Sequence, residues 1–246
     1  MDKKLALIIG GSGGIGGAVT KRLIRDGMRV CCTYFKNKEK IRKFRELFGN
    51  DSISFFKCDA RKDTDVETTV EKILRLYKKI DVVVFTVTVP LKNKRILELE
   101  WCDIYEHFEL QLKAMMFVLK SLRGQIRSGY RTKFIAISSE ACIGSPPKGL
   151  SHYIAAKYGA MGFSKAMAVE LVQYGSTINM ISPGMVDTSL LKDLPHKLIE
   201  VAAHNNPLKR IATPEDIANV VSFLASDEAD YLNGVNIPVN GGGVII

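Results

Sequence analysis

Short apolar segments alternate with longer amphipathic ones along this chain of 246 residues. The apolar segments are rich in β-branched and aromatic residues and have no polar face, which is typical of strands buried on both sides. Strands are predicted at residues 5–9, 29–34, 52–58, 81–90, 133–137, 176–181 and 235–239. Helices are predicted from the turn after the first strand to about residue 25 and at 38–48, 63–78, 103–127, 151–173 and 214–225.

This regular alternation indicates a parallel sheet with helices on both faces. No linker, internal repeat or low-complexity segment interrupts the pattern. The predicted fold is therefore α/β: a single-domain, doubly wound sheet of the Rossmann type that spans residues 1–246.

The composition is that of an ordinary globular protein, with 46% hydrophobic and 25% charged residues. No apolar run approaches the roughly 20 residues that span a bilayer. Glycines interrupt the first apolar segment too early for the core of a signal peptide. We therefore expect a cytoplasmic protein without a membrane partner. The five cysteines form no C-x-x-C pair, and no metal site is expected.

The net charge of +9 is most concentrated in "KNKEKIRKFR", residues 36–45. Glutamates interrupt this stretch and no aromatic platform accompanies it, so it is interpreted as the solvated face of a surface helix. Ile41, Phe44 and Leu47 would then face the core. A nucleic-acid-binding module that uses the charge remains a lesser alternative, and no nucleic-acid partner is expected.

A glycine-rich stretch, "IIGGSGGIGG" at residues 8–17, joins the first strand to the first helix. Gly10, Gly14 and Gly16 would let the backbone close on a pyrophosphate, and free N–H groups at a helix N-terminus attract negative charge. The position of this motif favours a dinucleotide-binding site, with a plain strand-to-helix turn as the alternative.

The residues after the second strand help to choose the cofactor. Proteins that prefer NAD place an acid near this point, bonded to the ribose 2′-hydroxyl. Here Lys36 and Lys38 precede the first acid, and a cation suits the 2′-phosphate of NADP(H), unless these lysines are only solvated. Asp59, after the third strand, is a candidate acceptor for the adenine amino group or a turn cap.

Three residues suggest proton chemistry. Tyr153 and Lys157 share one face of a predicted helix at i and i+4. A lysine beside a phenol would lower the pKa of the phenol from about 10 and make it a proton donor and acceptor near neutral pH. Ser139 follows the strand at 133–137, at the sheet edge where ligands bind in open α/β sheets.

Together these residues resemble the short-chain dehydrogenase/reductase family, in particular its 3-oxoacyl-carrier-protein reductase branch, over nearly the whole chain. The segment "SPGMVDT" at 182–188 is similar to the family's P-G-x-x-x-T segment, which closes over the nicotinamide. The expected cofactor contacts are Gly10, Ser12, Gly14, Ile15, Gly16, Lys36, Asp59, Ala60, Tyr153, Lys157, Val186 and Thr188.

The resemblance implies NADP(H)-dependent reduction of a ketone to a secondary alcohol, with a 3-oxoacyl thioester as one candidate substrate. Ser139 would hold the carbonyl oxygen, Tyr153 would protonate it, and Lys157 would bind the nicotinamide ribose. The resemblance also implies a homotetramer or homodimer.

The chain departs from the family pattern at three places. Ile9 replaces a threonine, residues 85–88 (Phe-Thr-Val-Thr) replace Asn-Asn-Ala-Gly, and Gln111 stands at the position of a catalytic asparagine. Thr86 and Thr88 could supply hydroxyl bonds in place of the lost amide. The longer glutamine moves its amide by roughly one C–C bond. An alternative is therefore a cofactor-binding protein with weak or no turnover, acting as a regulatory or assembly subunit.

The substrate is less constrained by the sequence. Tyr130 and Tyr174 stand where the carrier-protein branch has arginines beside the mouth of the site, although Arg127, Arg131 and Lys133 are close to the first. The loop at 140–152 and the segment at 189–210 are expected to line the pocket. An apolar lid or plain helix packing would account for Leu190, Leu191, Leu194 and Leu198.

Overall fold

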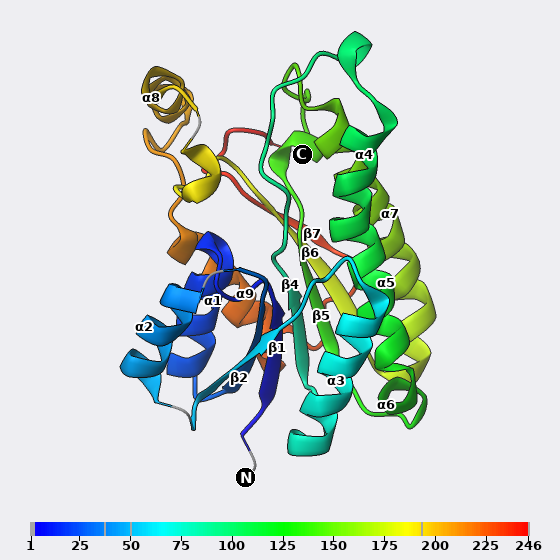
Figure 1. The fold of residues 1–246 in the computed structure, drawn as a ribbon. Coiled ribbons are helices and arrows are strands. Elements are labelled where there is room, and N and C mark those ends of the chain that lie inside the picture. Colours follow the sequence, from blue (N-terminus) through cyan, green and yellow to red (C-terminus); the bar gives the residue numbers. More distant parts are fainter. Residues whose placement is uncertain (1–2, 37, 50, 193, 246) are drawn as a thin grey trace.

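The computed structural model describes residues 3–36, 38–49, 51–192 and 194–245. Within these residues the strands form one parallel, seven-stranded sheet in the order β3-β2-β1-β4-β5-β6-β7, which confirms the predicted fold class (Figure 1). The order reverses between β1 and β4, as in a doubly wound fold. The strands are β1 (Leu5–Ile9), β2 (Arg29–Tyr34), β3 (Ile53–Lys57), β4 (Val82–Phe85), β5 (Lys133–Ile137), β6 (Thr177–Pro183) and β7 (Asn236–Val239).

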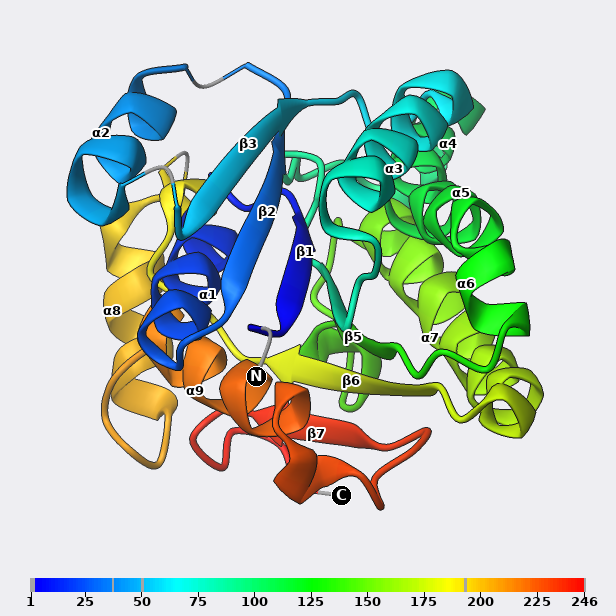
Figure 2. The same ribbon diagram turned by 90° about the horizontal axis from the view of Figure 1, so that it is seen from below.

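Helices cover both faces of the sheet (Figure 2). One face carries α1 (Gly14–Arg25), α2 (Lys38–Phe48) and α9 (Pro214–Ala225), with α8 (His196–Asn205) beyond the sheet edge on the same side (Figure 1). The other face carries α3 (Asp63–Tyr77), α4 (Trp101–Phe108), α5 (Ala114–Ser121), α6 (Arg123–Arg127) and α7 (Ser151–Leu171). None of the helices in the described ranges is both long enough and apolar enough to cross a membrane.

The hydrophobic core is divided by the sheet into two layers. Alternate residues of β1 contribute to each layer: Leu7 packs with α3, α5 and α7, while Ile8 packs with α1 and α9. Every residue of β4 is buried. The central strands are continuous apolar runs because both of their faces are covered.

Strand β4 is shorter than the predicted strand at 81–90, since it ends at Phe85. Phe85 pairs with Ile9, the last residue of β1. Beyond this pair β1 turns into the glycine-rich segment, so the residues that follow Phe85 lose their partner strand on that side. On the other side β5 ends at Ile137, one residue after Ala136, the partner of Phe85. The strand propensity of the residues after Phe85 is overridden by the lack of a partner.

The helix predicted at 103–127 is divided into α4, a π-helical turn η2 (Glu109–Lys113), α5 and α6. It begins earlier than predicted, at Trp101, because Glu100 and Asp103 form a capping box. The π-helical turn contains one residue more than an α-helical turn and is often found at functional sites. Gln111 lies within this turn.

One predicted core position on α2 is wrong. Ile41 and Phe44 are buried as expected, but Leu47 is 66% exposed. Phe48 takes its place in the inward-facing stripe, where its ring stacks on that of Phe44. The buried positions thus follow i, i+3 and i+7, and Leu47 falls just outside this face.

Candidate active site

A cleft lies at the carboxyl edge of the sheet, where the parallel strands end. It is formed by the segments that follow β1, β2, β3 and β4, together with residues 188–190, and encloses about 1680 Å³ open to solvent. The predicted cofactor contacts that line it are Gly10, Ser12, Gly14, Ile15, Gly16, Lys36, Asp59, Ala60 and Thr188. The side chain of Val186 is instead buried in the core, because its backbone pairs with Ala212 in a short parallel bridge.

Close backbone contacts explain the glycines of the turn. Gly10 has φ +91°, in the left-handed region that favours glycine. A Cβ atom on Gly16 would lie 2.3 Å from the carbonyl oxygen of Gly10, and one on Gly14 would lie 2.6 Å from the Thr188 side chain. Helix α1 begins directly after Gly13, which has no side chain to cap the first N–H groups. These groups are left for an anionic ligand.

The unusual exit of β4 stabilises this turn. Both the backbone N–H and the hydroxyl of Thr86 donate to the carbonyl oxygen of Ile9, at 3.0 and 2.8 Å. The predicted bond from Thr86 is thus present. Thr88 donates instead to the carbonyl oxygen of its neighbour Val89 at 3.3 Å and makes no bond to the turn.

Two cations stand at the β2 and β3 end of the cleft. Lys36 Nζ and Arg61 Cζ lie 5.2 and 5.3 Å from the centre of the Phe35 ring. The sequence reasoning missed Arg61, although its position two residues after Asp59 in "CDAR" was the available signal. The side chain of Lys38 lies outside what the structure describes.

Asp59 closes the turn after β3. Its Oδ1 accepts from the backbone N–H of Arg61 at 3.2 Å, and both of its carboxylate oxygens accept from the Arg61 guanidinium at 2.8 and 2.7 Å. These bonds hold the pKa of Asp59 below its usual range. The turn-cap role of Asp59 is thus present in the structure, and because Asp59 also lines the cleft, its contact with an adenine stays a prediction.

The three residues predicted to carry proton chemistry come together at the end of β5. The Tyr153 phenol lies beside the Ser139 side chain, which accepts from the backbone N–H of Ala141 at 3.3 Å. Lys157, one helical turn after Tyr153 on α7, donates from Nζ to the carbonyl oxygen of Ile137 at 2.6 Å. The end of β5 thus positions two of the three residues: Ser139 comes two residues after it, and Lys157 is bonded to its last carbonyl group.

The pKa of Tyr153 is shifted opposite to the expectation. Burial raises the pKa of Tyr153 to about 12, against the opposing effect of the Ser139 hydrogen bond. Lys157 Nζ lies over the face of the Tyr153 ring, 5.7 Å from its centre, and burial lowers the pKa of Lys157 to about 8. The prediction that Lys157 lowers the tyrosine pKa is therefore wrong here, because desolvation of both groups dominates.

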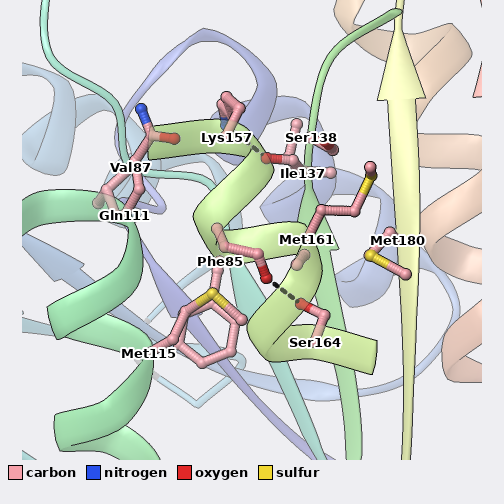
Figure 3. Close-up of a pocket in the computed structure, with 12 residues that line it drawn as sticks. Phe85, Val87, Gln111, Met115, Ile137, Ser138, Lys157, Met161, Ser164 and Met180 are labelled. Carbon is pink, nitrogen blue, oxygen red and sulfur yellow. Dashed lines mark hydrogen bonds between the residues drawn. The ribbon is translucent and has the colours of Figure 1, made fainter. Parts of the chain in front are cut away.

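Gln111 lines a small cavity together with Lys157 and three methionines (Figure 3). The space open to the centre of a water molecule is about 20 Å³, room for roughly one water. Gln111 Nε2 lies 3.5 Å from His107 Nδ1, whereas Oε1 is buried and has no hydrogen-bond partner among the described residues. In Figure 3 this oxygen is on the side facing Lys157. Val87 lines both this cavity and the main cleft.

The positions matched to carrier-binding arginines do not form a basic mouth in this chain. The Tyr130 hydroxyl donates to Asp81 Oδ1 at 2.6 Å, at the edge of the sheet where β4 and β5 begin. Ser139 is at the opposite edge. Lys133 is paired with Asp230 at 2.5 Å. The basic surface expected near Tyr130 therefore lies away from the site.

The leucines of the expected lid divide between cleft and surface. Leu190 lines the cleft and Leu191 is buried, whereas Leu194 and Leu198 are exposed. Leu198 belongs to α8, which the sequence reasoning did not place. Of these four leucines, only Leu190 contributes apolar surface to the cleft.

Comparison with known proteins agrees with this geometry. A family model described as enoyl-(acyl carrier protein) reductase matches residues 10–243. The 3-oxoacyl-[acyl-carrier-protein] reductase FabG of Staphylococcus epidermidis is 31% identical, over 97% of this chain and 98% of the relative. FabG of Staphylococcus aureus is 32% identical, over 97% of both chains. The chain belongs to the short-chain dehydrogenase/reductase family. It is therefore an oxidoreductase that uses a nicotinamide cofactor.

Solved structures with the same fold include one with NADP bound. The structure of ElxO with NADP bound has a TM-score of 0.89 and 25% sequence identity, and the match covers 98% of this chain and 99% of that one. A short-chain dehydrogenase/reductase from Brucella melitensis has a TM-score of 0.91 over 99% of this chain and 97% of its own, with 24% identity. The close glycine turn, the free start of α1 and the cations beyond it fit a dinucleotide of this family.

Substitution of Gly16 by alanine should weaken cofactor binding, because the new methyl group must displace the carbonyl oxygen of Gly10. Such overpacking costs about 1–3 kcal/mol. The dissociation constant of NADPH, measured by fluorescence titration, should rise by about 5- to 150-fold.

Gly17→Ala is the matched control for this experiment, since its Cβ would lie 3.4 Å from the Phe44 ring and in the next position of the same helix. It should bind NADPH as the unmodified protein does. Equal affinities for the Gly16 and Gly17 variants, both shown to be folded by circular dichroism, would contradict the role given to the turn.

Proposed function

We propose that this protein reduces a ketone to a secondary alcohol with NADPH. The observation that carries the proposal is the contact between the buried Tyr153 phenol and the Ser139 side chain at the end of β5. This pair lies at the edge of the sheet onto which the cofactor cleft opens. Lys157 Nζ lies over the Tyr153 ring, and Lys157 would also bind the ribose of the cofactor.

The chain's own residues would act as follows. A tyrosine with a pKa of about 12 is fully protonated at neutral pH, which is the state required of a proton donor. The Ser139 hydroxyl would donate to the carbonyl oxygen of the substrate and so stabilise the developing negative charge. Bound NADPH supplies the hydride. After proton donation, the positive charge of Lys157 would stabilise the Tyr153 phenolate.

The small cavity offers a route for returning the proton. Lys157 and Gln111 both line it, and a single water there would connect the Lys157 ammonium group to the Gln111 amide. With a pKa of about 8, Lys157 exchanges its proton readily near neutral pH. Gln111 would thus hold the water by its side-chain oxygen.

NADP(H) is favoured over NAD(H) by the residues around Phe35. Lys36 and Arg61 both line the cleft there, and no acid ends β2. Arg61 is the stronger candidate for the 2′-phosphate, because its planar guanidinium can bond two phosphate oxygens. Its pairing with Asp59 keeps it in place within the cleft.

A second candidate is a cofactor-binding family member with weak or no turnover. It is favoured by the long 3.5 Å contact of Gln111 and by the position of this residue in a π-helical turn. It would act as a regulatory or assembly subunit. The intact group of Ser139, Tyr153 and Lys157 supports the enzyme instead.

The substrate class, assembly and location are part of the same proposal. The names of the FabG relatives make a 3-oxoacyl thioester a candidate ketone, carried or free. Exposed apolar side chains on α5, on α7 and directly after α7 support a homotetramer or homodimer. They are Met116, Tyr158, Val169 and Val172. We place the protein in the cytoplasm, where NADPH is available.

Tyr153→Phe should nearly abolish turnover, because the hydroxyl that donates the proton is removed. Loss of a general acid lowers kcat by about 10²–10⁴-fold. NADPH oxidation with a panel of 3-oxoacyl thioesters and simple ketones measures the effect. Tyr158→Phe, an exposed tyrosine on the same helix, is the control and should keep full activity. An active Tyr153→Phe would refute the assigned role, and an unmodified protein that never oxidises NADPH would favour the second candidate.

Arg61→Gln should weaken NADPH binding and leave NADH binding unchanged, because only NADPH carries the 2′-phosphate. Loss of a hydrogen bond to a charged group costs about 1.5–3 kcal/mol, or about 10- to 150-fold in the dissociation constant. Lys36→Gln should act in the same direction. Lys62→Gln, an exposed cation outside the cleft lining, is the control. Equal losses for both cofactors, or an unmodified protein that prefers NADH, would contradict this assignment.

A further inference from the structure

Two histidines are buried beside the proposed proton donor. His107 on α4 and His152 on α7 pack edge to face with ring centres 5.0 Å apart, and the His107 ring lies 5.9 Å from the Tyr153 ring. Both histidines are almost fully buried. His107 precedes Gln111 by four residues, so the start of the π-helical turn brings the two side chains together.

We propose that His107 is a positioning residue for Gln111: its Nδ1 accepts a hydrogen bond from Gln111 Nε2 and thereby turns the amide oxygen toward Lys157. This inference rests on the proposed reductase function, because it assigns His107 a part in preparing the cavity that would return the proton to Tyr153.

The direction of this bond requires one form of the imidazole. An amide nitrogen can only donate, so Nδ1 of His107 must carry no proton, and the proton of the neutral ring is on Nε2. In a charged imidazole both nitrogens donate. The contact would then join two donors, and Gln111 would turn its oxygen toward His107 and its nitrogen toward Lys157.

The surroundings of His107 keep it neutral. Burial, with further contributions from His152 and Lys157 on α7, lowers the pKa of His107 to about 4. Tyr153, the remaining titratable neighbour on α7, is uncharged at neutral pH because its pKa is about 12. Asp103, four residues before His107 on α4, is the nearest acid along the helix, and its charge is balanced by an ion pair with Lys94.

The second histidine stays neutral for the same reason. Burial lowers the pKa of His152, and the charges nearest to it, Asp103 and Lys94, form an ion pair with each other at 2.5 Å. The His152 ring lies near the backbone of Lys92, while its Nδ1 has no partner in the described part of the chain. The two imidazole rings thus pack beside Gln111 and Tyr153 without adding a charge there.

A glutamine needs this support more than a shorter amide would. Its extra methylene adds a rotatable bond, and its nitrogen and oxygen ends are nearly equal in shape. Only the oxygen end can accept from Lys157 or from a water that Lys157 binds. The acceptor atom of His107 lies on the opposite side of the amide. It selects the orientation in which the Gln111 nitrogen donates to His107 and the oxygen faces Lys157.

Two substitutions separate the hydrogen bond from simple packing. His107→Phe keeps a ring of similar volume but removes the acceptor, whereas His107→Asn is smaller and places its Oδ1 where Nδ1 stood. If the acceptor matters, kcat for NADPH oxidation should fall by about tenfold in His107→Phe, as expected for about 1.4 kcal/mol. It should be largely restored in His107→Asn, with the NADPH dissociation constant unchanged in both. The reverse ranking, with the phenylalanine variant the more active, would overturn the proposal.

A double-mutant cycle tests whether His107 acts through Gln111. In a Gln111→Leu background, His107→Phe should cause no further loss of kcat, since the amide it positions is gone. Independent, additive losses would assign His107 a separate role and so contradict the inference.

The tautomer of His107 can be read without any assay of turnover. Heteronuclear NMR of protein labelled in the histidine ring nitrogens should show a neutral, Nε2-protonated His107 at neutral pH, assigned by its loss in His107→Asn. A charged ring or the Nδ1-protonated tautomer would refute the proposal whatever the activity. If the expected tautomer is found but no ketone is reduced, the proposed function fails while the hydrogen bond stands.

Discussion

The functional edge of this protein depends on how the ends of β1 and β4 are held together where the strand order reverses. Ile9 and Phe85 form the last pair of the two strands, and Thr86 then donates twice to the Ile9 carbonyl. After β1 the chain enters the glycine turn, and after β4 it lines the cleft. The side chains of Thr86 and Val87 come so close to Gly10 that a larger residue there would collide with them. Within the departure from the family's sequence at 85–88, Thr86 thus joins the ends of the two strands by hydrogen bonds of its own.

Burial determines the protonation states of the residues around Tyr153. It raises the pKa of Tyr153 and lowers those of Lys157 and His107, so each group is shifted toward its neutral form. A neutral phenol is suited to donate a proton, and a lysine with a pKa of about 8 is suited to exchange one. A neutral His107 can accept from Gln111. Desolvation thus keeps Tyr153 able to donate a proton, Lys157 able to exchange one and His107 able to accept from Gln111.

Only a few of the basic residues that the structure describes lie where they could contact the cofactor. Most of the basic stretch at 36–45 lies on the solvated face of α2, as its periodicity predicted. Lys36 precedes that helix and joins Arg61 around Phe35, where a phosphate would gain from both. The net charge of +9 is therefore a poor guide to the site, whereas the placement of two cations in one cleft is informative.

The sequence alone determined the α/β fold, the glycine turn and the identity of Ser139, Tyr153 and Lys157, because these depend on local periodicity and on short spacings. Tertiary structure decided what depends on contacts between distant segments. Strand β4 ends at Phe85, where its neighbour β1 ends, and Val186 lies in the core with its backbone bridged to Ala212. Arg61 enters the cleft because β2 and β3 end side by side, and His107 reaches Gln111 and Tyr153 because α4 packs on α7. The direction of the Tyr153 pKa shift also depends on tertiary structure: the spacing placed a lysine nearby, but only the packed structure shows that burial raises the pKa of the tyrosine.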